Sequence, residues 1–111
     1  MIAGILLLIA APQAGPMPAA GDSEAVMEEI VITARRARGV RWDWRVNKAG
    51  RLTKCKITRS SGDREIDQIG CDATRRCAAS GVRREREMRA CIVPLRKQLL
   101  RSLAERRAAG R

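Results

Sequence analysis

Side chains alternate between apolar and polar along residues 40–47, which is typical of a β-strand with one buried face. The apolar positions are Val40, Trp42, Trp44 and Val46. The next residues, Asn47-Lys48-Ala49-Gly50, suit a short turn, because asparagine bonds its own backbone and glycine tolerates positive φ. Residues 51–59 alternate again. The sequence therefore predicts a β-hairpin over residues 40–59.

The period of the pattern changes after this hairpin. The second strand places Thr53, Cys55 and Ile57 on one face, and Ser60-Ser61-Gly62-Asp63 then supplies chain-breaking and helix-capping residues. Behind them apolar residues recur every three or four positions, which predicts a helix over residues 63–79. This stripe consists of Ile66, Ile69, Ala73 and Cys77.

A second helical stripe predicts a helix over residues 82–107. Its members are Met88, Ile92, Leu95, Leu99 and Leu103. Pro94 lacks a backbone donor, so we expect a kink there, and one kinked helix is favoured because the stripe stays in phase. We expect the stripe to pack on the hairpin; the alternative is that it binds a partner.

The order of these features resembles the C-terminal domain of the TonB family of periplasmic energy transducers. The resemblance rests on strands 42–46 and 52–58, the turn ending at Gly50, Ser60-Ser61-Gly62 and Ile66-Asp67. It covers residues 40–79 and implies an α+β fold with a protein-binding role linked to TonB-dependent transport. The family continues into a third strand, whereas residues 80–111 form a basic helical tail. The chain thus looks like a truncated TonB-C-terminal-like domain.

Residues 28–36, EEIVITARR, are similar to the TonB box of TonB-dependent outer-membrane transporters. A β-branched run bounded by charges can add to the edge of a sheet. We therefore expect residues 21–39 to be an extended arm that pairs with its own sheet or another copy; a plain first strand or linker is the alternative. The protein-binding residues that the similarity implies are Glu29, Ile30, Val31, Ile32 and Thr33.

The first 20 residues carry no charged side chain and include the apolar run Ile2–Ala11. A membrane span needs about 20 apolar residues, so this run fits the hydrophobic region of a signal peptide better. We expect a periplasmic or secreted protein that is cleaved after Ala14 or Ala20. An uncleaved anchor and a misassigned start are the alternatives.

Four cysteines and the absence of phenylalanine and tyrosine predict a thin core reinforced by disulfides. The resemblance to the TonB family favours Cys55–Cys71 with Cys77–Cys91. The predicted helix places Cys77 in its apolar stripe and Cys71 at the flank of that stripe, so a second pairing, Cys55–Cys77 with Cys71–Cys91, stays open. The spacing lacks the close pairs of structural zinc sites and of redox motifs, and the chain has no histidine. We therefore expect neither metal nor cofactor.

The net charge is +11 and comes mainly from residues 35–59 and 82–111. Nucleic acid is a poor candidate partner, because both tryptophans lie on the expected core face and no nucleic-acid-binding motif is found. The alternative to protein binding is a cationic envelope protein that binds anionic membrane or lipopolysaccharide through its C-terminal helix. The anionic-surface candidates are Arg83, Arg84, Arg86, Arg89, Arg96, Lys97 and Arg101.

Catalysis is not expected, because the usual general base near neutral pH, histidine, is missing. Asp63 and Asp67 lie near a predicted helix N-terminus, where the macrodipole favours carboxylates, and Ser60 and Ser61 lack a histidine partner. The predicted organisation is a signal peptide (1–20), an arm (21–39), a hairpin with helix (40–79) and a basic helical tail (80–111).

Overall fold

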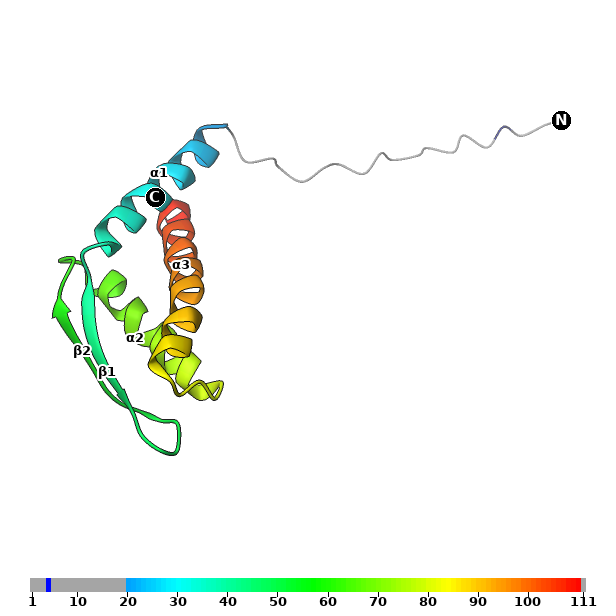
Figure 1. Cartoon of the computed structure of the whole chain (residues 1–111). Helices are drawn as coiled ribbons and strands as arrows, with labels where there is room; N and C mark the ends of the chain where they lie inside the picture. Colours follow the sequence, from blue (N-terminus) through cyan, green and yellow to red (C-terminus); the bar gives the residue numbers. More distant parts are fainter. Residues whose placement is uncertain (1–3, 5–19, 111) are drawn as a thin grey trace.

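The computed structural model describes Gly4 and residues 20–110. Its elements are α1 (Ala20–Ala37), β1 (Arg41–Val46), β2 (Leu52–Arg59), α2 (Arg64–Ala79) and α3 (Glu85–Ala109). The α+β class is confirmed, with an antiparallel hairpin followed by two helices. In Figure 1 the hairpin lies on one side of α2 and α3 on the other, while α1 crosses above α2 and packs against α3. The predicted signal peptide falls almost wholly outside the described residues.

The hairpin has the predicted inner and outer faces, with one correction. Trp44 lies opposite Cys55, and Val46 lies opposite Leu52. The register shifts between Arg45 and Val46. This bulge leaves Thr53 outside the regular pairing, so Thr53 is exposed and Leu52 takes the inner-face position. The assignment of Thr53 to the inner face is therefore wrong.

The two predicted helices are confirmed as α2 and α3. Asp63 caps α2 by accepting bonds from the backbone N–H groups of Glu65 and Ile66, and the predicted stripe of α2 is buried. The α3 helix continues through Pro94 as one helix. Its stripe packs on α2 and α1, and Trp42, Trp44 and Val46 of the hairpin pack against the same buried clusters.

The prediction of an extended arm over residues 21–39 is wrong, because residues 20–37 form α1. Glu and Ala are abundant in its first half and favour helix. Acidic residues lie toward its N-terminus, and Arg35 and Arg36 lie in its last turn, as the helix dipole favours. Glu29, Thr33 and Ala37 form a buried face at helical spacing. Packing against α3 therefore outweighs the β-branched character of residues 30–33.

Two buried clusters form the core, and Trp42 packs against both. One gathers residues from α1, α2 and the end of α3 together with Val40, which precedes β1, while the other joins α2 to the first half of α3. The indole N–H of Trp42 donates to Thr74 Oγ1 at 3.0 Å. Its ring lies on Gly70, where an added Cβ would be 2.9 Å from ring carbons. The guanidinium of Arg96 lies 5.1 Å from the ring centroid.

The disulfides are Cys55–Cys71, between β2 and α2, and Cys77–Cys91, between α2 and α3. This is the pairing that the TonB resemblance favoured, and the alternative pairing is wrong. Loops of this length contribute about 3 kcal/mol each by restricting the unfolded chain. Such bonds persist in oxidising compartments, so the structure indicates a non-cytoplasmic environment.

The contact between Gly70 and Trp42 gives a stability prediction. Gly70→Ala places a methyl group against a ring held on its other sides, so it should destabilise the fold by about 1–3 kcal/mol. Gly39→Ala is the matched control, because nothing lies within 4 Å of its added Cβ. It should cost about 0.5 kcal/mol or less. Urea unfolding of both variants checks this, and equal effects would contradict the proposed packing.

Candidate functional site

The second edge of β1 pairs with no strand in the part of the chain that the structure describes. A cleft of about 540 Å³ runs beside the β1 strand and is closed on its other side by the start of α3. We name it the β1–α3 cleft. It is lined by Trp42, Asp43, Trp44, Arg45, Lys54, Arg83, Glu85 and Arg89.

Backbone groups of the two tryptophans face the open edge of β1. The carbonyl of Arg45 accepts a bond from Thr53 Oγ1, and the N–H of Asn47 donates to the carbonyl of Arg51, so both residues face β2. Backbone direction alternates along an antiparallel strand, which turns the N–H and C=O groups of Trp42 and Trp44 the other way. An exposed edge of this kind can pair with another extended segment.

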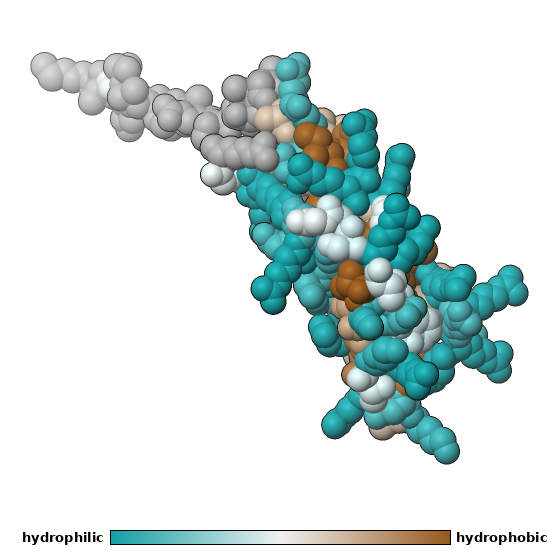
Figure 2. Space-filling view, turned by 90° about the vertical axis from the view of Figure 1, so that its left-hand side faces the viewer, coloured by the Kyte–Doolittle hydropathy of each residue, from teal (hydrophilic) through white to brown (hydrophobic). Residues whose placement is uncertain are grey.

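The cleft has more positive than negative groups. Glu85 pairs with Arg89 at 2.9 Å, which leaves Asp43 facing the charges of Arg45, Lys54 and Arg83. Figure 2, which views the hairpin side of the molecule, shows a largely hydrophilic surface from which long polar side chains project. An anionic partner is therefore favoured electrostatically at this cleft.

Arg83 also fixes one wall of the cleft. Its guanidinium donates to the carbonyls of Ala78 and Val82 at 3.0 and 3.1 Å. It also covers Gly50, whose φ of +80° is the one that the hairpin turn needs. The loop between α2 and α3 thus packs against the turn of the hairpin through Arg83.

The predicted anionic-surface residues divide into two groups. Six of them are exposed: Arg83, Arg84, Arg86, Arg89, Lys97 and Arg101. Arg96 is half-buried and donates to the carbonyl of Ala37 at 2.6 Å, so it lies between α1 and α3, apart from the six exposed cations. Burial, together with the charge of Arg41, lowers the pKa of Arg96.

The predicted protein-binding segment lies on α1. Glu29 and Thr33 are buried, Ile30 and Ile32 are half-buried, and Val31 is exposed. Because these residues are helical, the structure does not bring them to the sheet edge as an added strand. Sequence reasoning missed the cleft, although the alternation of residues 40–47 had placed Asp43 and Arg45 on the polar face.

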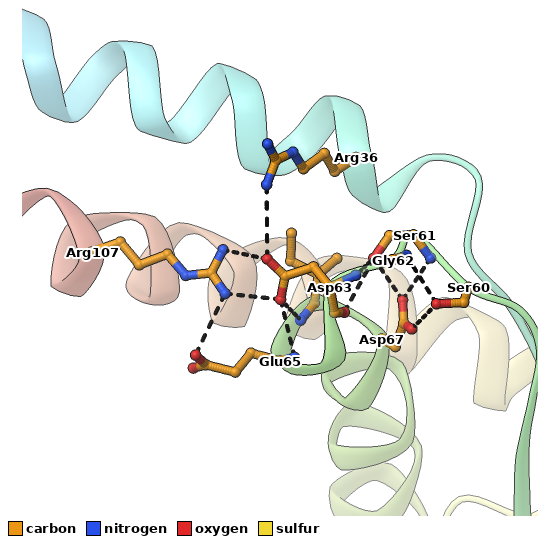
Figure 3. A network of polar contacts seen from close by, with 9 residues as sticks. Arg36, Ser60, Ser61, Gly62, Asp63, Glu65, Asp67 and Arg107 are labelled. Carbon is orange, nitrogen blue, oxygen red and sulfur yellow. Dashed lines mark hydrogen bonds and ion pairs between the residues drawn. The ribbon is translucent and has the colours of Figure 1, made fainter.

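The acidic cluster at the start of α2 has a structural role, as expected from its position. Figure 3 shows Asp63 between Arg107 of α3 and Arg36 of α1. Arg107 binds both carboxylate oxygens of Asp63 at 2.7 and 2.9 Å, and Arg36 approaches to 3.9 Å. The hydrogen bonds from Arg107 are the main reason that the pKa of Asp63 is lowered from 3.8 to about 2.

Asp67 is held by the serine pair that precedes the helix. Burial alone would raise the pKa of this carboxyl group, but hydrogen bonds from the Ser60 hydroxyl and from Ser61 outweigh it and lower the pKa. Asp63 and Asp67 therefore both act as acceptors in the hydrogen bonds that hold the start of α2.

Within residues 20–110 and Gly4, no group of three or more potential ligands could hold a metal ion. None of the helices in that same portion has the length and apolar character needed to cross a membrane. Comparison of the chain with protein-family models, curated proteins and solved structures found no match in any of the three.

The lowered pKa of Asp63 predicts a pH dependence of stability. The folded pKa lies below the unfolded one, so the contribution is complete above about pH 4 and is lost as the pH falls towards 2. After allowance for solvent screening, it amounts to about 1–2 kcal/mol. Asp63→Asn should therefore flatten the dependence of the unfolding free energy on pH in this range.

Asp72→Asn is the control, because the exposed ion pair of Asp72 with Arg75 lies within α2 and joins no other element. Denaturant unfolding at a series of pH values measures both variants. An unchanged pH profile for Asp63→Asn would show that the contact with Arg107 contributes nothing.

Proposed function

We propose that the protein is an exported, non-catalytic binding protein that holds an acidic segment of a protein partner in the β1–α3 cleft. The open edge of β1, lying beside an excess of positive charge, is the observation that carries this proposal. A concave site at a strand edge suits a peptide better than a flat membrane. Export is supported by the two disulfides and by the apolar run near the N-terminus.

Strand addition is the mode of binding that the backbone favours. The partner segment would hydrogen-bond to the outward backbone groups of Trp42 and Trp44, and its acidic side chains would meet Arg45, Lys54 and Arg83. The resemblance of residues 40–79 to the TonB family supports a protein-binding role and a link to TonB-dependent transport. The α1 segment that resembles a TonB box takes no part in this binding mode, because it is helical.

A peptide of alternating glutamate and valine tests the cleft directly. Trp42 and Trp44, the only tryptophans of the chain, line the cleft and report binding through their fluorescence. The double variant Arg45→Ser/Lys54→Ser should weaken binding about tenfold or more, since it removes two charge contacts. High salt should weaken the wild-type complex in the same way.

Arg75→Ser/Arg76→Ser is the matched control, because both residues are exposed on α2 and neither lines the cleft. It removes the same charge and should leave the affinity within about twofold, as distant surface changes do. Equal weakening by both double variants would show attraction by net charge alone and would reject the cleft as the site.

Membrane-surface binding by α3 is the second candidate. Arg86, Arg89 and Lys97 are exposed on this helix together with Val93, which is 67% exposed. Such a combination is typical of segments that lie on anionic lipid. Vesicles of phosphatidylglycerol, compared with phosphatidylcholine, test it in the same fluorescence assay. Strong binding to the anionic vesicles alongside no binding of the acidic peptide would favour this candidate.

Export and disulfide formation can be measured together. Intact-mass analysis of the protein recovered from the cell envelope should show loss of the leader at Ala14 or Ala20. Alkylation without reduction should leave the mass unchanged, because all four cysteines are paired. Recovery of the uncut chain from the cytoplasm with four reactive thiols would contradict export.

A further inference from the structure

A second cavity, of about 320 Å³, lies between α1 and α3. We name it the α1–α3 groove. Its volume is at the lower end of the range of small-molecule sites, about 300–1,000 Å³. Six apolar and three cationic residues line it, with no acidic one: Ala34, Ala37, Arg38, Trp42, Ile92, Val93, Arg96, Lys97 and Leu100.

The cations of this groove have no carboxylate partner among the described residues. The six ion pairs of that part of the chain do not include Arg38, Arg96 or Lys97. Arg96 is half-buried; its Nη2 bonds the carbonyl of Ala37, and its buried Nε has no hydrogen-bond partner. A guanidinium in this position is costly unless an anion compensates its charge.

The apolar wall of the groove continues along α1. Val31 precedes Ala34 by three residues and Met27 precedes Val31 by four, so the three lie on one face of the helix. Val31 is 50% exposed and Met27 is 58% exposed. From Ala34 to Met27 this strip is about 10 Å long, at 1.5 Å per helical residue. On α3, the exposed Val93 borders the same groove.

We propose that the α1–α3 groove binds a single-chain fatty-acid anion. The carboxylate lies among Arg38, Arg96 and Lys97, and the hydrocarbon chain covers the apolar strip of α1 and α3. A short apolar cavity next to uncompensated cations fits both parts of such a molecule, whereas a small inorganic anion would leave the apolar wall uncovered. This site is separate from the β1–α3 cleft, although Trp42 borders both cavities.

Dodecanoate below its micellar concentration is the probe, and calorimetric titration of the full chain is the measurement. We expect one bound anion per chain. A neutral dodecyl glycoside should bind about tenfold or more weakly, because it lacks the charge-assisted contacts. Acetate, which lacks the chain, should show no measurable binding. Equal affinity for dodecanoate and the neutral glycoside, or no binding of dodecanoate, would overturn the proposal.

Variants locate the site. Arg38→Glu/Lys97→Glu reverses two exposed charges of the groove and should weaken dodecanoate binding about tenfold or more. Arg84→Glu/Arg86→Glu makes the same change of charge on exposed residues outside the groove and should leave the affinity within about twofold. Equal weakening by both pairs would overturn the proposal. Circular dichroism verifies that each variant is folded.

The cleft variant Arg45→Ser/Lys54→Ser separates this site from the proposed function. It should still bind dodecanoate with unchanged affinity while losing the acidic peptide. Loss of dodecanoate binding in this variant would overturn the assignment of the fatty-acid site to the groove, whereas failure of the peptide assay alone would leave that assignment intact.

Discussion

The packing of Trp42 between the hairpin and the helices is the interaction on which the rest of the structure depends. Its ring fills the space above Gly70, its N–H binds Thr74, and Arg96 stacks on it. Both core clusters include this side chain at their border. The chain has no phenylalanine or tyrosine, so the ring of Trp42 joins two small cores. The disulfides add the stability that cores of this size do not supply.

The acidic residues Asp63 and Asp67 serve the fold, whereas many of the basic residues are free to bind a partner. Asp63 joins the start of α2 to the end of α3 through Arg107, and Asp67 accepts hydrogen bonds from the serines that precede α2, as Figure 3 shows. Many of the cations, by contrast, have no such role and remain on the surface. The excess of positive charge is therefore available to anionic partners, and the fold concentrates part of it beside two cavities of different character. One borders a strand edge, and the other borders an apolar helix face.

The hairpin and the last two helices could be predicted from sequence because their patterns are local and agree with their burial. Cysteine pairing needed the family resemblance, since helical positions left two pairings open. Residues 30–33 were misread because a β-branched run fits a strand as well as a helix; contacts with α3, distant in sequence, decide the outcome. The half-buried position of Arg96 and both cavities could not be predicted, because each depends on segments that are far apart in the chain.

The disulfides make some parts of the molecule open more slowly than others. They connect β2 to α2 and α2 to α3, whereas α1 has no cysteine. Apart from the peptide chain itself, α1 is held to the rest of the fold by noncovalent contacts only. They include the Arg36–Asp63 ion pair and the hydrogen bond from Arg96 to the carbonyl of Ala37. Amide hydrogens of α1 should thus exchange by local opening, before the covalently joined hairpin and α2 unfold. Such an opening widens the α1–α3 groove while the open edge of β1 keeps its shape.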